Sequence, residues 1–197
     1  MISWKYRFIF IHVPKCAGTS IMEALKGYYN RYTGHRLSKF IRRQINSGNF
    51  YVFTCVRNPW DRVVSNYHYT QLQKSYWHSD NNSTTYGVHE DYNLVKDATF
   101  SEYIDLISSK KLRSKHTYSQ LYWLKPYINN IDKIIKIENI EDEFDEFCKF
   151  KNIQNNLGIV NKSNHDVYTS YYDSASIDKV REIYREDIEY FNYIYGE

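Results

Sequence analysis

The chain has 197 residues, enough for one domain with a single hydrophobic core and too few for two comfortable domains. Its composition is 42% hydrophobic and 25% charged, which excludes a wholly disordered chain. The net charge of +3 is too small to indicate a nucleic-acid-binding protein, but it suits a small anionic ligand. We therefore expect a single domain over residues 1–197 that does not bind nucleic acid.

The cysteines and the N-terminal segment bear on the compartment. Cys16, Cys55 and Cys148 are odd in number, widely separated and without metal-ligand spacing, so neither a disulfide framework nor a metal site is expected. The apolar run at residues 8–13 ends before Pro14 and is too short for a signal peptide or a membrane span. The sequence therefore predicts a cytoplasmic protein with no membrane-spanning segment.

Three short apolar runs predict buried strands. The first is FIFIHV at residues 8–13, the second is YVFTCV at 51–56, and the weaker third is KIIKIE at 133–138. Each is followed by a stretch compatible with a helix. Alternating strands and helices predict an α/β fold with a central parallel β-sheet flanked by helices, and a ligand site at the carboxyl ends of the strands.

The helical stretches have recognisable starts and spacing. After the second strand, Asn58 can cap a helix, Pro59 suits its first position, and Asp61 lies in its first turn. Residues 100–108, 140–150 and 176–191 place apolar side chains at three- and four-residue spacing, as amphipathic helices do. The polar segment 73–99 is longer than a normal connection and is interpreted as a loop insertion, either functional or mobile.

The first strand runs into a turn of small residues and then a helix. The turn is Lys15-Cys16-Ala17-Gly18-Thr19-Ser20, whose small side chains let the backbone approach an anion. A Walker loop would place lysine directly before the last hydroxyl residue, whereas Lys15 comes first, so an ATP or GTP loop is disfavoured. The phosphatase spacing of Cys and Arg is also missing. A strand-turn-helix joint without a ligand remains the alternative at this point.

A second motif follows the second strand. Arg57 lies at the mouth of that strand and Ser65 lies on the helix behind it. A guanidinium and a hydroxyl so arranged can share one phosphate. Taken alone, the pair also fits a surface arginine and an incidental helical serine.

Together, HVPKCAGTS at 12–20 and FTCVRNPWDRVVSNY at 53–67 resemble the sulfotransferases that use 3′-phosphoadenosine 5′-phosphosulfate (PAPS). The similarity is to the carbohydrate and heparan-sulfate-like branch, sulfotransferase family 2 type. Further segments look like that branch in the same order: 34–40, 118–124, 135–140, 160–168 and 180–193. The resemblance implies a P-loop-like three-layer domain and an O-sulfotransferase acting on a glycan or another small hydroxylated acceptor.

The resemblance also implies roles for single residues. Lys15 to Ser20 would hold the 5′-phosphosulfate, with Lys15 catalytic as well, and Arg57 with Ser65 would hold the 3′-phosphate. Lys162 and Ser163 would close over the 3′-phosphate. PAPS is the expected cofactor, and no metal is predicted.

Seven histidines compete for the role of general base, because neutral imidazole accepts a proton near physiological pH. His35 is the candidate, since it resembles a histidine beside the acceptor in the carbohydrate branch, and His116 is the alternative. His12 is interpreted as a structural residue. Two other functions stay open: an atypical nucleotide kinase or NTPase, and a catalytically inactive nucleotide-binding module.

Overall fold

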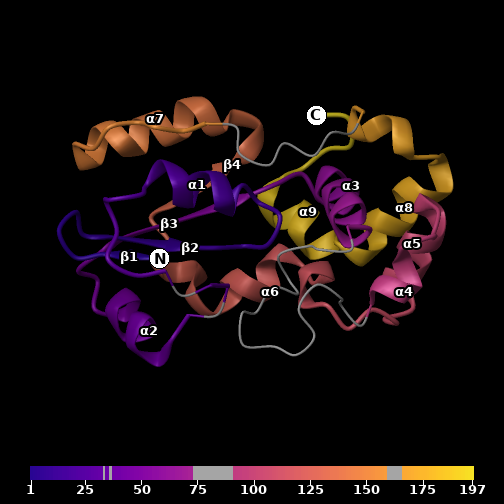
Figure 1. Cartoon of the computed structure of the whole chain (residues 1–197), viewed down its shortest axis with the longest axis horizontal. Helices are drawn as coiled ribbons and strands as arrows, with labels where there is room; N and C mark the ends of the chain where they lie inside the picture. Colours follow the sequence, from indigo (N-terminus) through magenta and orange to yellow (C-terminus); the bar gives the residue numbers. More distant parts are fainter. Residues whose placement is uncertain (33, 36, 73–90, 159–165) are drawn as a thin grey trace. The chain divides into compact units, whose positions relative to one another are not determined.

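The computed structural model describes residues 1–32, 34–35, 37–72, 91–158 and 166–197, and these fall into two compact units (Figure 1). The first, called the sheet unit below, comprises Met1–Arg57 and Gln120–Lys162. The second, the helical unit, comprises Asn58–Ser119 and Ser163–Glu197. The boundary falls directly after Arg57, so the first sequence motif lies in the sheet unit and the second is divided between the two units.

The sheet unit is built on four strands in the order β1-β2-β3-β4. They are β1 (Ile2–Ser3), β2 (Phe8–Ile11), β3 (Tyr51–Val56) and β4 (Lys133–Lys136). β2, β3 and β4 run parallel, and the short β1 adds an antiparallel edge to β2 that the sequence did not predict. The predicted α/β class with a central, mainly parallel sheet flanked by helices is confirmed.

Among its described residues, the sheet unit has the α-helices α1 (Gly18–Ala24), α2 (Lys39–Asn46), α6 (Gln120–Leu124) and α7 (Ile140–Lys151). The 3-10 turns η3 (Lys125–Asn130) and η4 (Ile137–Asn139) flank β4. α2 and α7 lie on opposite sides of the strands (Figure 1). Ser38 caps α2 by accepting a hydrogen bond from the Ile41 N–H, and Ile41 and Ile45 are its buried residues.

Aromatic side chains fill the space between the sheet and α7. The Phe147 ring lies 4.2 Å from that of Phe53 and 5.5 Å from that of Phe8, measured between ring centroids. Phe10 continues the same face of β2, with its ring 5.0 Å from that of Phe53. Offset aromatic packing of this kind fixes the register of α7 over the strands. The next residue on this face is His12.

The helical unit contains α3 (Pro59–Thr70), α4 (Tyr92–Val95), α5 (Phe100–Ser108), α8 (Ser174–Ile183) and α9 (Arg185–Phe191), with 3-10 turns η2 (Lys115–Thr117) and η5 (Tyr168–Tyr171). Asn58 caps α3 as predicted, accepting from the Trp60 N–H at 3.2 Å. The core of the helical unit contains Trp60, Tyr103, Ile104 and Val180.

The predicted helix over 176–191 is wrong in one respect, because it is two helices. Tyr184 leaves helical geometry, with φ −112° and ψ 25°, and separates α8 from α9. Its side chain is buried, and its hydroxyl donates to the Thr117 carbonyl oxygen at 2.7 Å. Apolar spacing alone did not reveal this break.

Two further predictions concern the 73–99 insertion and membrane-spanning segments. Of the predicted insertion 73–99, residues 73–90 lie outside the described residues, and α4 occupies part of the remainder. Within the described ranges, no helix is both long and apolar enough to cross a membrane.

Candidate active site

The turn after β2 has an unusual backbone. Lys15 and Ala17 both adopt left-handed conformations, with φ of 66° and 54°, on either side of Cys16. Such conformations are uncommon for residues other than glycine and cost on the order of 1–3 kcal/mol each. Turns that alternate in this way bring successive N–H groups together into an anion-binding concavity. The backbone of residues 15–17 therefore resembles that of an anion-binding loop, with the Cys16 N–H donating to the Val13 carbonyl oxygen at 3.4 Å.

Cys16 is fully buried in this loop and is held by a hydrogen bond. Its Sγ donates to Gln120 Oε1 at 3.1 Å, and Gln120 is fully buried as well. None of the three cysteines forms a disulfide. Burial, together with Cys16 and Glu143 nearby, raises the pKa of the Cys55 thiol, so this group stays protonated at neutral pH. Cys55 is therefore not a thiolate nucleophile.

The Gln120 side chain also binds the end of β3. Its Oε1 accepts from the Arg57 N–H at 2.8 Å, and its Nε2 donates to the Arg57 carbonyl oxygen at 2.9 Å. At the neighbouring strand ends, the Thr54 hydroxyl donates to the Ile11 carbonyl oxygen at 2.8 Å. The structure therefore brings the Lys15–Ser20 turn and Arg57 to the same edge of the sheet, as the parallel-sheet rule predicts.

His12 explains why residue 18 is glycine. The imidazole is buried against Gly18, so that a methyl group built on the Gly18 Cα would lie 1.8 Å from His12 Nε2. Gly18 has no left-handed backbone requirement, and the need for glycine is purely steric. The prediction that His12 is structural stays compatible with this packing, but the residue also forms one wall of the loop.

Gly18→Ala is therefore expected to lower the free energy of unfolding by about 1–3 kcal/mol, because the His12 ring or the loop must move. Thermal and denaturant melts measure this. Gly158→Ala is the matched control, since nothing lies within 4 Å of its added methyl group and its backbone is not left-handed.

The double variant His12→Ala/Gly18→Ala tests the cause of the Gly18 effect. With the ring gone, the alanine at position 18 should add little to the cost of His12→Ala alone. Additive costs, or a Gly18→Ala melting temperature equal to that of Gly158→Ala, would contradict the steric explanation.

One cluster of four side chains contains His12, Tyr32, His35 and Trp123. His12 Nδ1 lies 2.7 Å from the Tyr32 hydroxyl, and the His35 ring centroid lies 4.2 Å from that of His12. Burial, and to a lesser extent Tyr29, raises the pKa of Tyr32 to about 12, so the phenol is neutral at physiological pH. Trp123 completes the group at 5.7 Å from His35. Its buried indole N–H has no hydrogen-bond partner among the described residues.

The protonation pattern of His35 follows from its hydrogen bond. Its Nδ1 lies 3.2 Å from the His12 carbonyl oxygen, which can only accept. The proton of the neutral ring therefore sits on Nδ1, and the lone pair sits on Nε2. This is the tautomer that a general base acting through Nε2 requires.

Four other predicted residues lie outside this cluster. Ser65 on α3 and His116 in η2 belong to the helical unit, where Ser65 is buried. Lys162 and Ser163 lie outside the described residues. These positions stay predictions.

Arg62 is a buried cation that sequence reasoning missed. It donates through Nη1 to the Tyr118 carbonyl oxygen and through Nη2 to that of His116, both at 2.9 Å. Its role is to hold the η2 segment against α3. An arginine four residues into a helix gives no local signal of such a contact.

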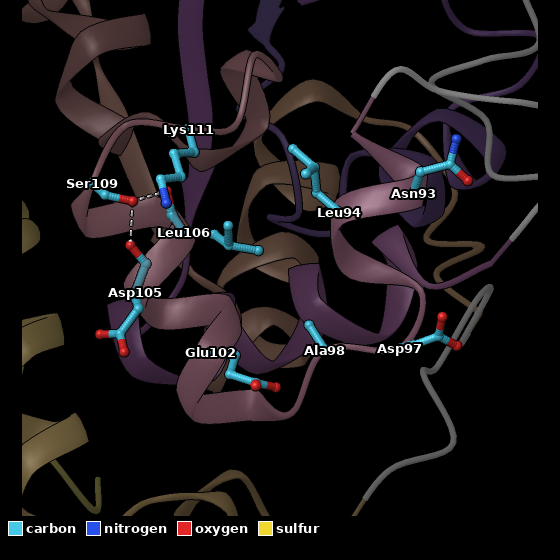
Figure 2. Close-up of a pocket in the computed structure, with 9 residues that line it drawn as sticks. All are labelled: Asn93, Leu94, Asp97, Ala98, Glu102, Asp105, Leu106, Ser109 and Lys111. Atoms are coloured by element: carbon cyan, nitrogen blue, oxygen red, sulfur yellow. Dashed lines mark hydrogen bonds between the residues drawn. The ribbon is translucent and has the colours of Figure 1, made fainter.

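A separate hollow in the helical unit is lined by Asn93, Leu94, Asp97, Ala98, Glu102, Asp105, Leu106, Ser109 and Lys111 (Figure 2). Its acidic residues serve the fold. Glu102 accepts from the Thr99 backbone and side chain in a capping box, which lowers the pKa of Glu102. Asp105 pairs with Lys179 at 2.5 Å. We therefore do not assign this hollow to catalysis.

The sequence model of the sulfotransferase family matches residues 1–194. The chain belongs to the sulfotransferase family. This confirms the family recognised from the two motifs and the predicted enzyme class, a sulfotransferase that takes its sulfuryl group from PAPS. A search of curated proteins found no significant match.

The fold of this sulfotransferase is similar to that of mouse sulfotransferase SULT7A1, solved in complex with PAP. The TM-score is 0.56 at 12% sequence identity, and the alignment covers 95% of this chain and 85% of the mouse chain. The predicted P-loop-like fold is thereby confirmed.

Proposed function

We propose that this sulfotransferase transfers the sulfuryl group of PAPS to a hydroxyl of a carbohydrate or another small hydroxylated acceptor by in-line displacement. The observation that carries the proposal is the junction at Gln120, which joins the left-handed turn at Lys15–Ala17 to the end of β3 at Arg57. The mouse sulfotransferase of similar fold was solved with PAP, and this supports a nucleotide site of the same kind here.

Binding is assigned to two groups of residues. Lys15 to Ser20 would hold the 5′-phosphosulfate, with loop amides and the hydroxyls of Thr19 and Ser20 as donors. Arg57 and Ser65 would hold the 3′-phosphate, with Lys162 and Ser163 closing over it. Arg57 suits this role because a guanidinium recognises phosphate oxygens through two parallel hydrogen bonds.

The chemistry is assigned to Lys15 and His35. His35 Nε2 takes the proton of the acceptor hydroxyl as the new bond between acceptor oxygen and sulfur forms. Lys15 neutralises the charge that develops on the bridging oxygen as the bond from sulfur to the 5′-phosphate breaks.

Transfer of radiolabelled sulfate from PAPS to a panel of glycans and small alcohols tests the proposal directly. We expect incorporation into at least one hydroxylated acceptor. Calorimetric titration with PAP and with ATP-Mg²⁺ runs beside it, and we expect PAP to bind more tightly. Tighter binding of ATP-Mg²⁺ would favour the kinase or NTPase alternative, and tight PAP binding without any transfer would favour an inactive binding module.

Arg57→Ala is expected to weaken PAP binding by about 10- to 100-fold, because a charge-assisted phosphate contact contributes roughly 1.5–3 kcal/mol. The backbone groups of Arg57 still bind Gln120 in this variant. Calorimetry measures the affinity, and Arg43→Ala on the exposed face of α2 is the control for loss of one positive charge. Unchanged PAP affinity in Arg57→Ala would remove Arg57 from the site.

A further inference from the structure

Gln120 is the first residue of α6 and is fully buried, and its side chain binds two segments outside α6. Its Oε1 accepts from the Cys16 thiol and from the Arg57 N–H, and its Nε2 donates to the Arg57 carbonyl oxygen. One amide therefore joins the turn after β2 to the end of β3. These are the two segments to which the proposed function assigns opposite ends of the nucleotide.

The contact requires a primary amide on a side chain of this length. Pairing with both backbone groups of Arg57 needs one acceptor and one donor in a plane, which among side chains only Asn and Gln provide while neutral and without tautomers. A glutamate would lose the donor to the Arg57 carbonyl oxygen, and a methionine would lose both interactions. The bond from Cys16 then uses the second lone pair of the same oxygen.

We propose that Gln120 is a positioning residue that sets the separation between the 5′-phosphosulfate loop at Cys16 and the 3′-phosphate residue Arg57. This rests on the proposed function for the assignment of the two phosphate sites. A ligand with two phosphates gains affinity over either half only if both sites are held at the right spacing, because the second contact then forms at high effective concentration. Gln120 sets this spacing because it binds both segments, which are distant from each other in the sequence.

The experiment compares three ligands: PAP, adenosine 5′-monophosphate and adenosine 3′-monophosphate, with the monophosphates measured by competition against PAP. In Gln120→Met, PAP binding should weaken by about 10-fold or more, because the loop and Arg57 are no longer held at the spacing that lets both phosphates bind at once. Binding of each monophosphate should change by less than about 3-fold, since neither spans the two sites. The ratio of the affinity for PAP to the affinity for each monophosphate, called the advantage of PAP below, should therefore fall.

Gln71→Met is the matched control. Gln71 also donates through Nε2 to backbone carbonyl oxygens, those of Val95 and Ala98, but it lies in the helical unit. Its variant should leave the advantage of PAP unchanged. Gln120→Asn keeps the planar amide on a side chain one methylene shorter, so it should show a smaller loss, and it carries the comparison if Gln120→Met melts below the assay temperature.

The outcomes separate the two claims. If the unmodified protein fails to bind PAP, the proposed function fails and the role of Gln120 fails with it. If the unmodified protein binds PAP but Gln120→Met weakens all three ligands equally, or leaves PAP unchanged, the proposed function stands and the positioning role is overturned. Loss confined to PAP supports both.

Discussion

Replacing Lys15 with methionine is expected to lower kcat by about 10²- to 10³-fold, the usual cost of removing one group that stabilises transition-state charge. PAP affinity should fall far less, since the loop amides and hydroxyls remain. Lys15 starts the turn after β2, and its left-handed backbone fixes where the side chain leaves the main chain. Methionine keeps the unbranched stem and removes only the charge.

Steady-state kinetics with PAPS, together with calorimetric titration of PAP, measure the two effects separately. Lys26→Met is the matched control. Lys26 follows α1 and is an exposed lysine, and it pairs with Glu23. If Lys15→Met instead raised KM for PAPS and left kcat unchanged, Lys15 would be a ground-state binding residue and not a catalytic one. Lys15→Arg should retain part of the rate, since it keeps a cation at that position.

The sequence was most informative where local pattern and local structure coincide. The buried apolar runs at 8–13 and 51–56 contain β2 and β3, and the Asn58-Pro59 start predicted α3. Parallel strands put their carboxyl ends at one edge, so the meeting of the Lys15 turn and Arg57 also followed from the sequence. These inferences need only periodicity, capping and the rules of sheet topology.

What the sequence did not reveal depends on contacts between distant segments. The bonds of Gln120 to Cys16 and Arg57 join side chain to backbone across the fold, and no periodicity marks them. Gly18 was explained from the sequence by the approach of an anion, whereas the structure adds the His12 ring as a steric reason. At the break between α8 and α9, the Tyr184 hydroxyl likewise binds a distant residue, donating to the Thr117 carbonyl oxygen.

His35→Ala is expected to lower kcat by about 10²- to 10⁴-fold, the contribution typical of a general base. PAP affinity should stay unchanged, because His35 is assigned to the acceptor and not to the nucleotide. The Nδ1–H bond to the His12 carbonyl oxygen holds the ring with its lone pair on Nε2, so a substitution must test the base and its orientation separately. His35→Asn retains a side-chain donor for that carbonyl and should be as inactive as His35→Ala.

The pH dependence of kcat distinguishes a base from a packing residue. With His35 present, the rate should fall at acid pH, because a protonated imidazole cannot take the proton from the hydroxyl of the acceptor. That acidic limb should be missing from the residual activity of His35→Ala. His116→Ala is the decisive comparison, since His116 is the alternative base and lies in the helical unit. If His116→Ala loses the acidic limb while His35→Ala keeps both the limb and the rate, His116 is the base. The contact of the tilted His35 ring with His12 then serves only to pack the wall of the loop.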